Sequence, residues 1–302
     1  MKLKLGFAPL TDSGPVIAAQ ALGFFADEGL EAELSREVSW ATIRDKVALG
    51  VLDGAHLLAP MALAEPGAPI VVPLTLARGG AAITLSSRIP GEDALSLARL
   101  IARRRNEGAS PLTLAIVYPY SVHNYLLRSW LAEAGVDPRA DVHITVAAPS
   151  RMAELLAAGV IEGFCAGEPW GPAAQAAGAG RVVVRVGEVW PVAPDKALGF
   201  GRDWAQADPS RLQAVLRAVT RATAWCAEPR NRDALAHLLA ERLELSAEVV
   251  SPGLAHVAFD ARPANRAEAA WLLGQMRRWG QLDPGADLRA CAEAVYRPDL
   301  CA

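Results

Sequence analysis

The stretch KLKLGFAPLTDSGPVIAAQAL, residues 2–22, contains a strand–loop–helix pattern that predicts the fold class. Residues 2–8 alternate polar and apolar side chains, which is typical of a β-strand. Ser13-Gly14-Pro15 predicts the start of a helix that runs to Leu22, because proline is tolerated in the first helical turn. A strand, a polar loop and a helix in this order indicate one repeat of an α/β sheet.

The same alternation of short apolar runs and amphipathic segments continues along most of the chain, which predicts an α/β fold with largely parallel sheets. The pattern restarts at about residue 90, and the last hundred residues are mainly helical. We therefore expect two lobes, one made of residues 1–88 and 197–302 and the other of residues 89–196. Extended crossings near 86–90 and 190–200 would form a hinge, with the polar loops of both lobes facing one cleft.

The composition excludes a disordered chain and argues against a protein that binds nucleic acid or a membrane. The chain has 302 residues, of which 52% are hydrophobic and 21% charged, and this composition excludes disorder. A formal charge of -3 argues against direct binding of nucleic acid or of an anionic membrane. No run approaches the roughly 20 apolar residues of a membrane span. The first residues lack the apolar core of a secretory signal, so we expect a cytoplasmic location.

Motifs of catalysis and metal binding are missing from the sequence. There is no Gly-x-Ser-x-Gly, no phosphate-binding P-loop and no dinucleotide-binding glycine motif. The cysteines are scattered and the histidines solitary, so neither a zinc site nor any other metal or cofactor is expected. We interpret His56 and His143, on predicted strands, as core or edge histidines. The chain is therefore predicted not to be an enzyme, with no catalytic residue.

Two basic side chains are candidate ligands for an anion. Ser121 predicts the N-cap of a helix from Val122, which places His123 in the first turn, where free backbone N–H groups favour an anion. A first-turn histidine exposed to water is the alternative. Lys196 precedes a predicted strand in a chain that has only four lysines. Selection for a compact ammonium is one interpretation; with Asp195 beside it, a solvated loop is favoured by the local sequence.

A carboxylate and two indoles complete the candidate residues. Gly167-Glu168-Pro169-Trp170 follows a short apolar strand, at the strand end where α/β clefts bind ligands. A structural corner at Pro169 is an equally good interpretation. Trp40 begins a predicted helix, from which its N–H could point into the cleft, and a core tryptophan is the alternative.

Several of these segments together resemble the nitrate-binding proteins of ABC transporters. The resemblance lies in Glu37–Lys46, Leu52–Met61, Phe164–Trp170 and Asp195–Gly199. It implies the two-lobed α/β fold of the periplasmic binding proteins (type II), with hinge and interlobe cleft. It also implies nitrate or nitrite as the ligand, held by Trp40, the Gly80-Ala81-Ala82 turn, His123 and Lys196, with Gly167 and Glu168 beside them. Relatives usually carry Asn or Gln at the position of Ala81.

The family also includes cytoplasmic nitrate/nitrite sensors of the NasS type, which hold an RNA-binding antiterminator of the NasT type until the anion arrives. Because no export signal is recognised, we expect this chain to be such a sensor, controlling nitrate assimilation genes. The alternative is the binding component of a nitrate/nitrite ABC transporter. Bicarbonate-binding relatives carry an acidic residue in place of Lys196 and use calcium, so Lys196 favours a monovalent anion alone. An enzyme on this fold would need Glu168 and His123 as its acid and base.

Overall fold

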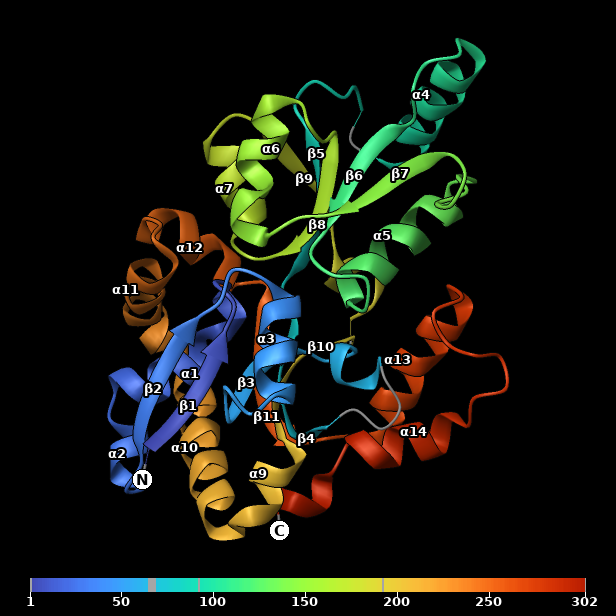
Figure 1. Ribbon diagram of the computed structural model, residues 1–302. Coiled ribbons are helices and arrows are strands. Elements are labelled where there is room, and N and C mark those ends of the chain that lie inside the picture. The colour runs from blue at the N-terminus through green and yellow to red at the C-terminus, as the bar shows by residue number, and fades with distance from the viewer. Residues whose placement is uncertain (1, 65–68, 92, 192, 302) are drawn as a thin grey trace.

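Two β-sheets form the framework of the protein. The computed structural model describes residues 2–64, 69–91, 93–191 and 193–301. In Figure 1 each sheet is the centre of its own lobe, with helices on its faces. The larger sheet has the strand order β11-β4-β10-β3-β1-β2, and the smaller has the order β7-β6-β8-β5-β9. The predicted two-lobed α/β fold is confirmed.

The strands of the larger sheet are β1 (Lys2–Phe7), β2 (Glu31–Arg36), β3 (Gly54–Leu58), β4 (Ile70–Gly79), β10 (Pro194–Gly201) and β11 (Val257–Pro263). Those of the smaller sheet are β5 (Ala81–Ser86), β6 (Leu112–Ile116), β7 (Val142–Val146), β8 (Gly163–Gly167) and β9 (Gly180–Arg185). Among these strands, β1 pairs in parallel with β2 and β3, and β6 pairs in parallel with β7 and β8. However, β10 runs antiparallel to β3 and β4, β11 to β4, and β5 to β8 and β9. Both sheets are therefore mixed, and the prediction of largely parallel sheets is wrong.

Helices cover both sheets. With the larger sheet lie α1 (Gly14–Ala21), α2 (Phe24–Asp27), α3 (Trp40–Ala48), α9 (Arg202–Ala207), α10 (Pro209–Ala227), α11 (Arg232–Leu243), α12 (Ala247–Leu254), α13 (Arg266–Arg278) and α14 (Leu288–Val295). With the smaller sheet lie α4 (Ala94–Asn106), α5 (Val122–Glu133), α6 (Met152–Ala158) and α7 (Trp170–Ala176), and α8 (Val186–Val189) follows β9. Among the described residues, no helix is long and apolar enough to cross a membrane.

The polar–apolar alternation of β1 produces the predicted burial. Leu3, Leu5 and Phe7 are buried in one apolar cluster with side chains of α1 and α10, whereas Lys2 and Lys4 are exposed. Burying the apolar face of β1 removes three large side chains from water, each worth about 1.5–3 kcal/mol. This packing holds the polar segment after β1 in a constant position at the carboxyl edge of the sheet.

The chain passes between the sheets at places that differ from the prediction. The first crossing lies at Gly80, between β4 in the larger sheet and β5 in the smaller one. Residues 81–86, expected in the first lobe, therefore pair with the second. Gly79 and Gly80 both have positive φ, 78° and 76°, and they redirect the chain from one sheet to the other. The return crossing leads through α8 into β10, so residues 194–196 belong to the larger sheet.

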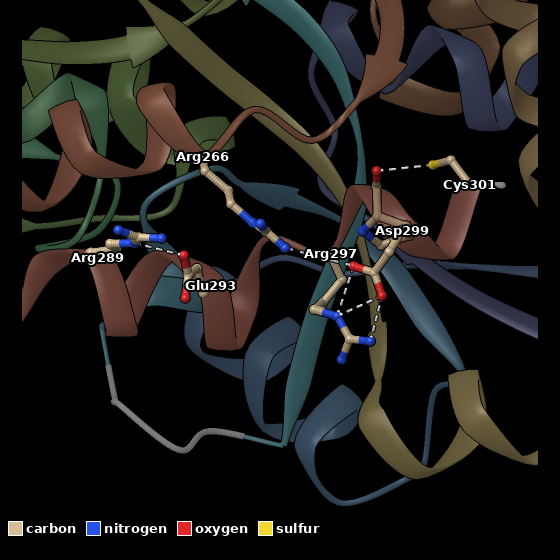
Figure 2. A network of polar contacts seen from close by, with 7 residues as sticks. Arg266, Arg289, Glu293, Arg297, Asp299 and Cys301 are labelled. Carbon is tan, nitrogen blue, oxygen red and sulfur yellow. Dashed lines mark hydrogen bonds and ion pairs between the residues drawn. The ribbon is translucent and has the colours of Figure 1, made fainter.

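The C-terminal segment is tied to the far end of the larger sheet. Figure 2 shows Arg297 on the carboxylate of Asp299, with an Nη2–Oδ2 distance of 2.6 Å, and Arg289 on Glu293. The thiol of Cys301 donates to the carbonyl of Pro73 in β4, at 3.1 Å. The Cys301 contact joins the last turn (Pro298–Cys301) to β4, whereas the Arg289–Glu293 and Arg297–Asp299 pairs lie within the C-terminal segment itself.

The start of α5 follows the capping rule predicted for it. Ser121 has extended φ and ψ, and its Oγ accepts the backbone N–H of Asn124 at 3.1 Å. The side chain is buried, so without it this N–H would lose its partner away from water.

We expect Ser121→Ala to lower the free energy of unfolding by about 1 kcal/mol. Ser39→Ala is the matched control, because Ser39 is the N-cap of α3 but makes no side-chain cap hydrogen bond. Denaturant unfolding of both variants measures the difference. Equal losses in the two variants would contradict the role of the Ser121 hydroxyl.

Candidate functional site

Three charged side chains meet in the interior beside the cleft. The ammonium of Lys196 lies 2.9 Å from Oδ2 of Asp12 and 2.6 Å from Oδ2 of Asp195. All three side chains have no exposed surface. We call Asp12, Asp195 and Lys196 the ionic cluster. The sequence-based interpretation of Asp195-Lys196 as a solvated loop is wrong, because both residues belong to β10.

An irregularity in β10 explains how two successive residues of one strand reach each other. Neighbouring side chains of a regular strand point to opposite faces of the sheet. The pairing of β10 with β4 shifts register on both sides of Lys196, between Pro194 and Lys196 and again between Lys196 and Ala197. Such bulges redirect side chains. Here the bulge allows Asp195 and Lys196 to form an ion pair.

Asp12 enters the cluster from the segment that follows β1. It lies in the short 3-10 helix Thr11–Ser13, directly before α1, and the whole of this segment is buried. Its other oxygen, Oδ1, is 3.0 Å from Nε2 of His56 in β3. Asp12 therefore joins His56 to Lys196. The predicted burial of His56 is correct, but His56 faces the ionic cluster, a role that its isolated position in the sequence does not reveal.

Trp40 extends this group toward the start of α3. Its indole has 1% exposed surface, and the ring centroid is 5.6 Å from that of His56. Within the part of the chain that the structure describes, Nε1 of Trp40 has no hydrogen-bond partner. A buried donor without a partner is costly. This N–H is therefore available to a ligand.

The smaller lobe contributes His123 from the first turn of α5. The imidazole is fully buried, so the alternative of a water-exposed histidine is wrong. Neither ring nitrogen has a hydrogen-bond partner among the described residues. Gly167 at the end of β8 lies between the lobes here: a Cβ at this position would be 3.6 Å both from Nε2 of His123 and from Oδ2 of Asp12. A Cβ there would also be only 2.9 Å from Cδ2 of Leu10, so both lobes pack closely around this glycine and a larger residue would not fit.

The crossing segment contributes less than expected. The N–H of Gly80 donates to the carbonyl of His256 at 2.8 Å, and its carbonyl accepts the N–H of Glu168 at 2.7 Å. The N–H of Gly80 is therefore committed within the protein. Ala81 is buried and pairs with Gly167 across the β5–β8 ladder.

The carboxylate of Glu168 contacts other neighbours. Its Oε1 is 3.5 Å from Nε of Arg185, and a Cβ at Gly253 in α12 would be 3.3 Å from its Oε2. Glu168 thus lies between the two lobes, where α12 packs against α7 (Figure 1). His123 and Glu168 face different partners, so the structure does not join them as an acid–base pair.

The electrostatics of the site follow from burial and from the ion pairs. Burial opposes the charge on Asp12, but Lys196 and His56 outweigh it and lower its pKa to about 2. Burial raises the pKa of Asp195 to about 6 in spite of Lys196. Burial also opposes the charge on Lys196, yet Asp12 and Asp195 raise its pKa. Burial, reinforced by Lys196, holds the pKa of His123 well below its ordinary value of 6.5.

Contacts across the cleft hold the lobes together over this site. The N–H of Thr11 donates to the carbonyl of Glu168 at 2.9 Å, and Nε1 of Trp170 donates to the carbonyl of Pro9 at 3.0 Å. On the other side, the hydroxyl of Tyr125 in α5 donates to Gln281 at 2.9 Å. Because the site side chains are buried beneath these contacts, the lobes must separate before a ligand can enter.

Comparison with known proteins identifies the family of the chain. Residues 1–240 match the NMT1-like family. The chain belongs to this family. It is 31% identical to the nitrate/nitrite binding protein NrtA of Synechococcus elongatus, over 98% of this chain and 75% of that protein. The crystal structure of the periplasmic nitrate-binding protein NrtA from Synechocystis PCC 6803 superposes with a TM-score of 0.89, at 28% identity, covering 99% of this chain and 86% of that one.

A second group of relatives is longer. The chain is 36% identical to the bicarbonate transport ATP-binding protein CmpC of Synechocystis, over 93% of this chain but 46% of that protein. It therefore spans about half the length of CmpC. The two-lobed fold predicted from the sequence and the resemblance to nitrate-binding proteins are both confirmed by this family of relatives.

Sequence reasoning named Trp40, His123 and Lys196, all of which are buried here, but it did not name the two carboxylates that hold the ammonium. Asp12 directly follows the first strand and precedes a helix, which is the kind of position that lines an α/β cleft. Asp12 could therefore have been identified from its position between a predicted strand and a predicted helix. No local signal indicates the bulge that turns Asp195 inward.

Glu168 should make stability depend on pH. Burial raises its pKa from 4.5 to about 7, although Arg185 opposes the shift. Between these two pH values the folded protein binds a proton that the unfolded chain has released. The contribution of Glu168 to the free energy of unfolding is therefore fully present below pH 4.5 and is lost as the pH rises through 7. The change amounts to about 3 kcal/mol.

We expect Glu168→Gln to remove most of this loss, measured as the free energy of unfolding in urea at pH 4.5 and pH 8. Glu154→Gln, a change to an exposed carboxylate on α6, is the control and should keep the wild-type slope. A Glu168→Gln variant that also keeps the wild-type slope would contradict burial of a protonated Glu168.

Proposed function

We propose that the chain binds nitrate or nitrite between its lobes and serves as the binding component of a nitrate/nitrite import system. The observation that carries this proposal is the convergence of Lys196, Trp40 and His123, buried from water, in a chain with NrtA among its relatives. The names of those relatives are of binding and transport proteins, which supports a binding function in place of an enzymatic one.

The donors suit a small planar oxyanion. An ammonium has three N–H donors, and Asp12 and Asp195 account for two of those on Lys196. The third, together with the N–H of Trp40 and an N–H of His123, would supply three donors from three different elements. Because an anion taken from water must be hydrogen-bonded to remain bound, such a set is needed for binding in a dry compartment.

The choice of nitrate or nitrite over bicarbonate rests on Lys196. The bicarbonate-binding relatives are expected to carry an acidic residue there and to bind calcium with their anion. Among residues 2–64, 69–91, 93–191 and 193–301, no group of three or more His, Cys, Asp or Glu side chains is arranged to hold a metal ion. An ammonium at this position supports recognition of a monovalent anion without a metal.

The sensor expected from the sequence is the second candidate role. It uses the same site but a different partner: an antiterminator of the NasT type in place of a permease and ATPase, with the chain in the cytoplasm. The resemblance to NasS-type sensors supports it, whereas the relatives found by comparison support transport at least as well. The two roles differ in what the closed, anion-bound lobes do to a partner.

Removing the cation should abolish binding. Lys196→Ala leaves two carboxylates beside the ligand, and loss of one member of a buried charge pair costs about 3–5 kcal/mol, or roughly 200- to 5000-fold in affinity. Calorimetric titration with nitrate measures the change. Lys46→Ala is the control, because Lys46 pairs with Glu37 near the surface. Wild-type affinity in Lys196→Ala would reject the site.

A milder change tests the indole without disturbing the ionic cluster. Trp40→Phe keeps an aromatic ring beside His56 and removes the N–H. We expect a loss of about 1–2 kcal/mol of binding, roughly 5- to 30-fold, with little change in the unfolding temperature of the free protein. Unchanged nitrate affinity would show that the indole N–H does not reach the ligand.

The two roles are separated by partner exchange. A sensor should form a complex with its antiterminator in the absence of ligand and lose it with millimolar nitrate or nitrite, whereas Lys196→Ala should form the complex but ignore the anion. Size-exclusion chromatography of the mixed proteins measures this. A complex that never forms, or that is indifferent to both anions, would exclude the sensor role and leave import.

A further inference from the structure

The closed compartment carries an unfavourable charge for an anion. With neutral imidazoles, one ammonium and two carboxylates leave the group around Lys196 with a net charge of -1. All of these groups are buried, so water does not screen them. Addition of a monovalent anion would change the net charge of this group and its ligand from -1 to -2. A buried charge without compensation is strongly destabilising, and proteins usually avoid it by changing the protonation state of a nearby group.

Four titratable groups of the site could accept a compensating proton. Asp12 is held by both Lys196 and His56, and Asp195 lies at 2.6 Å from Lys196, so protonation of either would weaken an existing ion pair. Nε2 of His56 already faces Asp12. His123 differs from these three, because both of its nitrogens lack partners among the described residues.

The surroundings of His123 favour a cation only when an anion is present. From β10 it faces the ammonium of Lys196, from the segment after β1 it faces Asp12, and from β8 it faces the backbone of Gly167. In the free, closed protein, burial and Lys196 keep it neutral. An anion bound between Lys196 and His123 would face both of them, and it would accept a hydrogen bond from an imidazolium N–H.

We propose that the cleft binds its anion together with one proton, which His123 carries as an imidazolium in the complex. This inference rests on the proposed function. It makes the protein a receptor for an anion and a proton at the same time. Between the pKa of His123 in the free protein and its higher value in the complex, each unit of pH increase lowers the affinity about tenfold.

Proton uptake can be counted directly by calorimetry. Nitrate remains ionised throughout the neutral range, so any proton that is bound goes to the protein. Titrations at pH 7 in buffers of different ionisation enthalpy should show about one proton taken up per nitrate, and the affinity should fall about tenfold from pH 7 to pH 8. Nitrate binding without proton uptake would overturn the inference. Absence of nitrate binding in the wild-type protein would instead overturn the proposed function.

Variants assign the proton to one residue. Glu168 could also take up a proton when the lobes close, so Glu168→Gln must retain the uptake if His123 is the acceptor. His123→Gln should lose it, and His143→Gln, on the exposed side of β7, should behave as the wild type. Uptake that persists in His123→Gln, or vanishes in Glu168→Gln, would overturn the assignment.

A measurement without substitution completes the test. In protein with isotope-labelled histidine, the NMR signals of His123 should change from those of a neutral ring to those of an imidazolium when nitrate is added at pH 7. A ring that stays neutral in the saturated complex would overturn the inference even if His123→Gln binds no nitrate.

Discussion

The ammonium of Lys196, held between the carboxylates of Asp12 and Asp195, is the interaction on which the site depends. One ammonium cannot be buried alone, and two carboxylates around it hold it charged and in place. Each partner comes from a different feature of the larger lobe: the segment after β1 and the bulge in β10. His56 then fixes the second oxygen of Asp12. The geometry of the cation is thus determined by the fold of one lobe, before any ligand arrives.

This arrangement divides the site between the two lobes. The ionic cluster, His56 and Trp40 all belong to the larger lobe, whereas His123 and Gly167 belong to the smaller one. Contacts such as the Thr11–Glu168 hydrogen bond join the halves only when the lobes meet. A ligand that bridges Lys196 and His123 therefore has contacts in the closed state that the open state lacks. That difference is what shifts the population toward closure.

The sequence was sufficient for the elements and for part of the site, because these depend on local patterns. The alternation in residues 2–8 and the cap at Ser121 predict β1 and α5 correctly, and with them the place of His123. The crossing at Gly80 and the inward turn of Asp195 were missed, because they depend on which strands pair. Residues 81–86 have the same apolar pattern in either sheet, and only the pairing of β5 with β8 and β9 decides between them.

Opening changes the environment of His123 but leaves the ionic cluster together. When the lobes separate, His123 moves into water and away from Lys196, so the two influences that lower its pKa are both removed. Closure without an anion must then bury a neutral imidazole, while closure over an anion is compatible with an imidazolium. At lower pH, His123 of the open protein is more often protonated and must lose this proton before the lobes close without an anion. The free energy of closing without an anion therefore rises relative to that of closing over an anion. If His123 carries the proton proposed above, burial of the site would couple ligand-bound closure to the proton concentration of the surroundings.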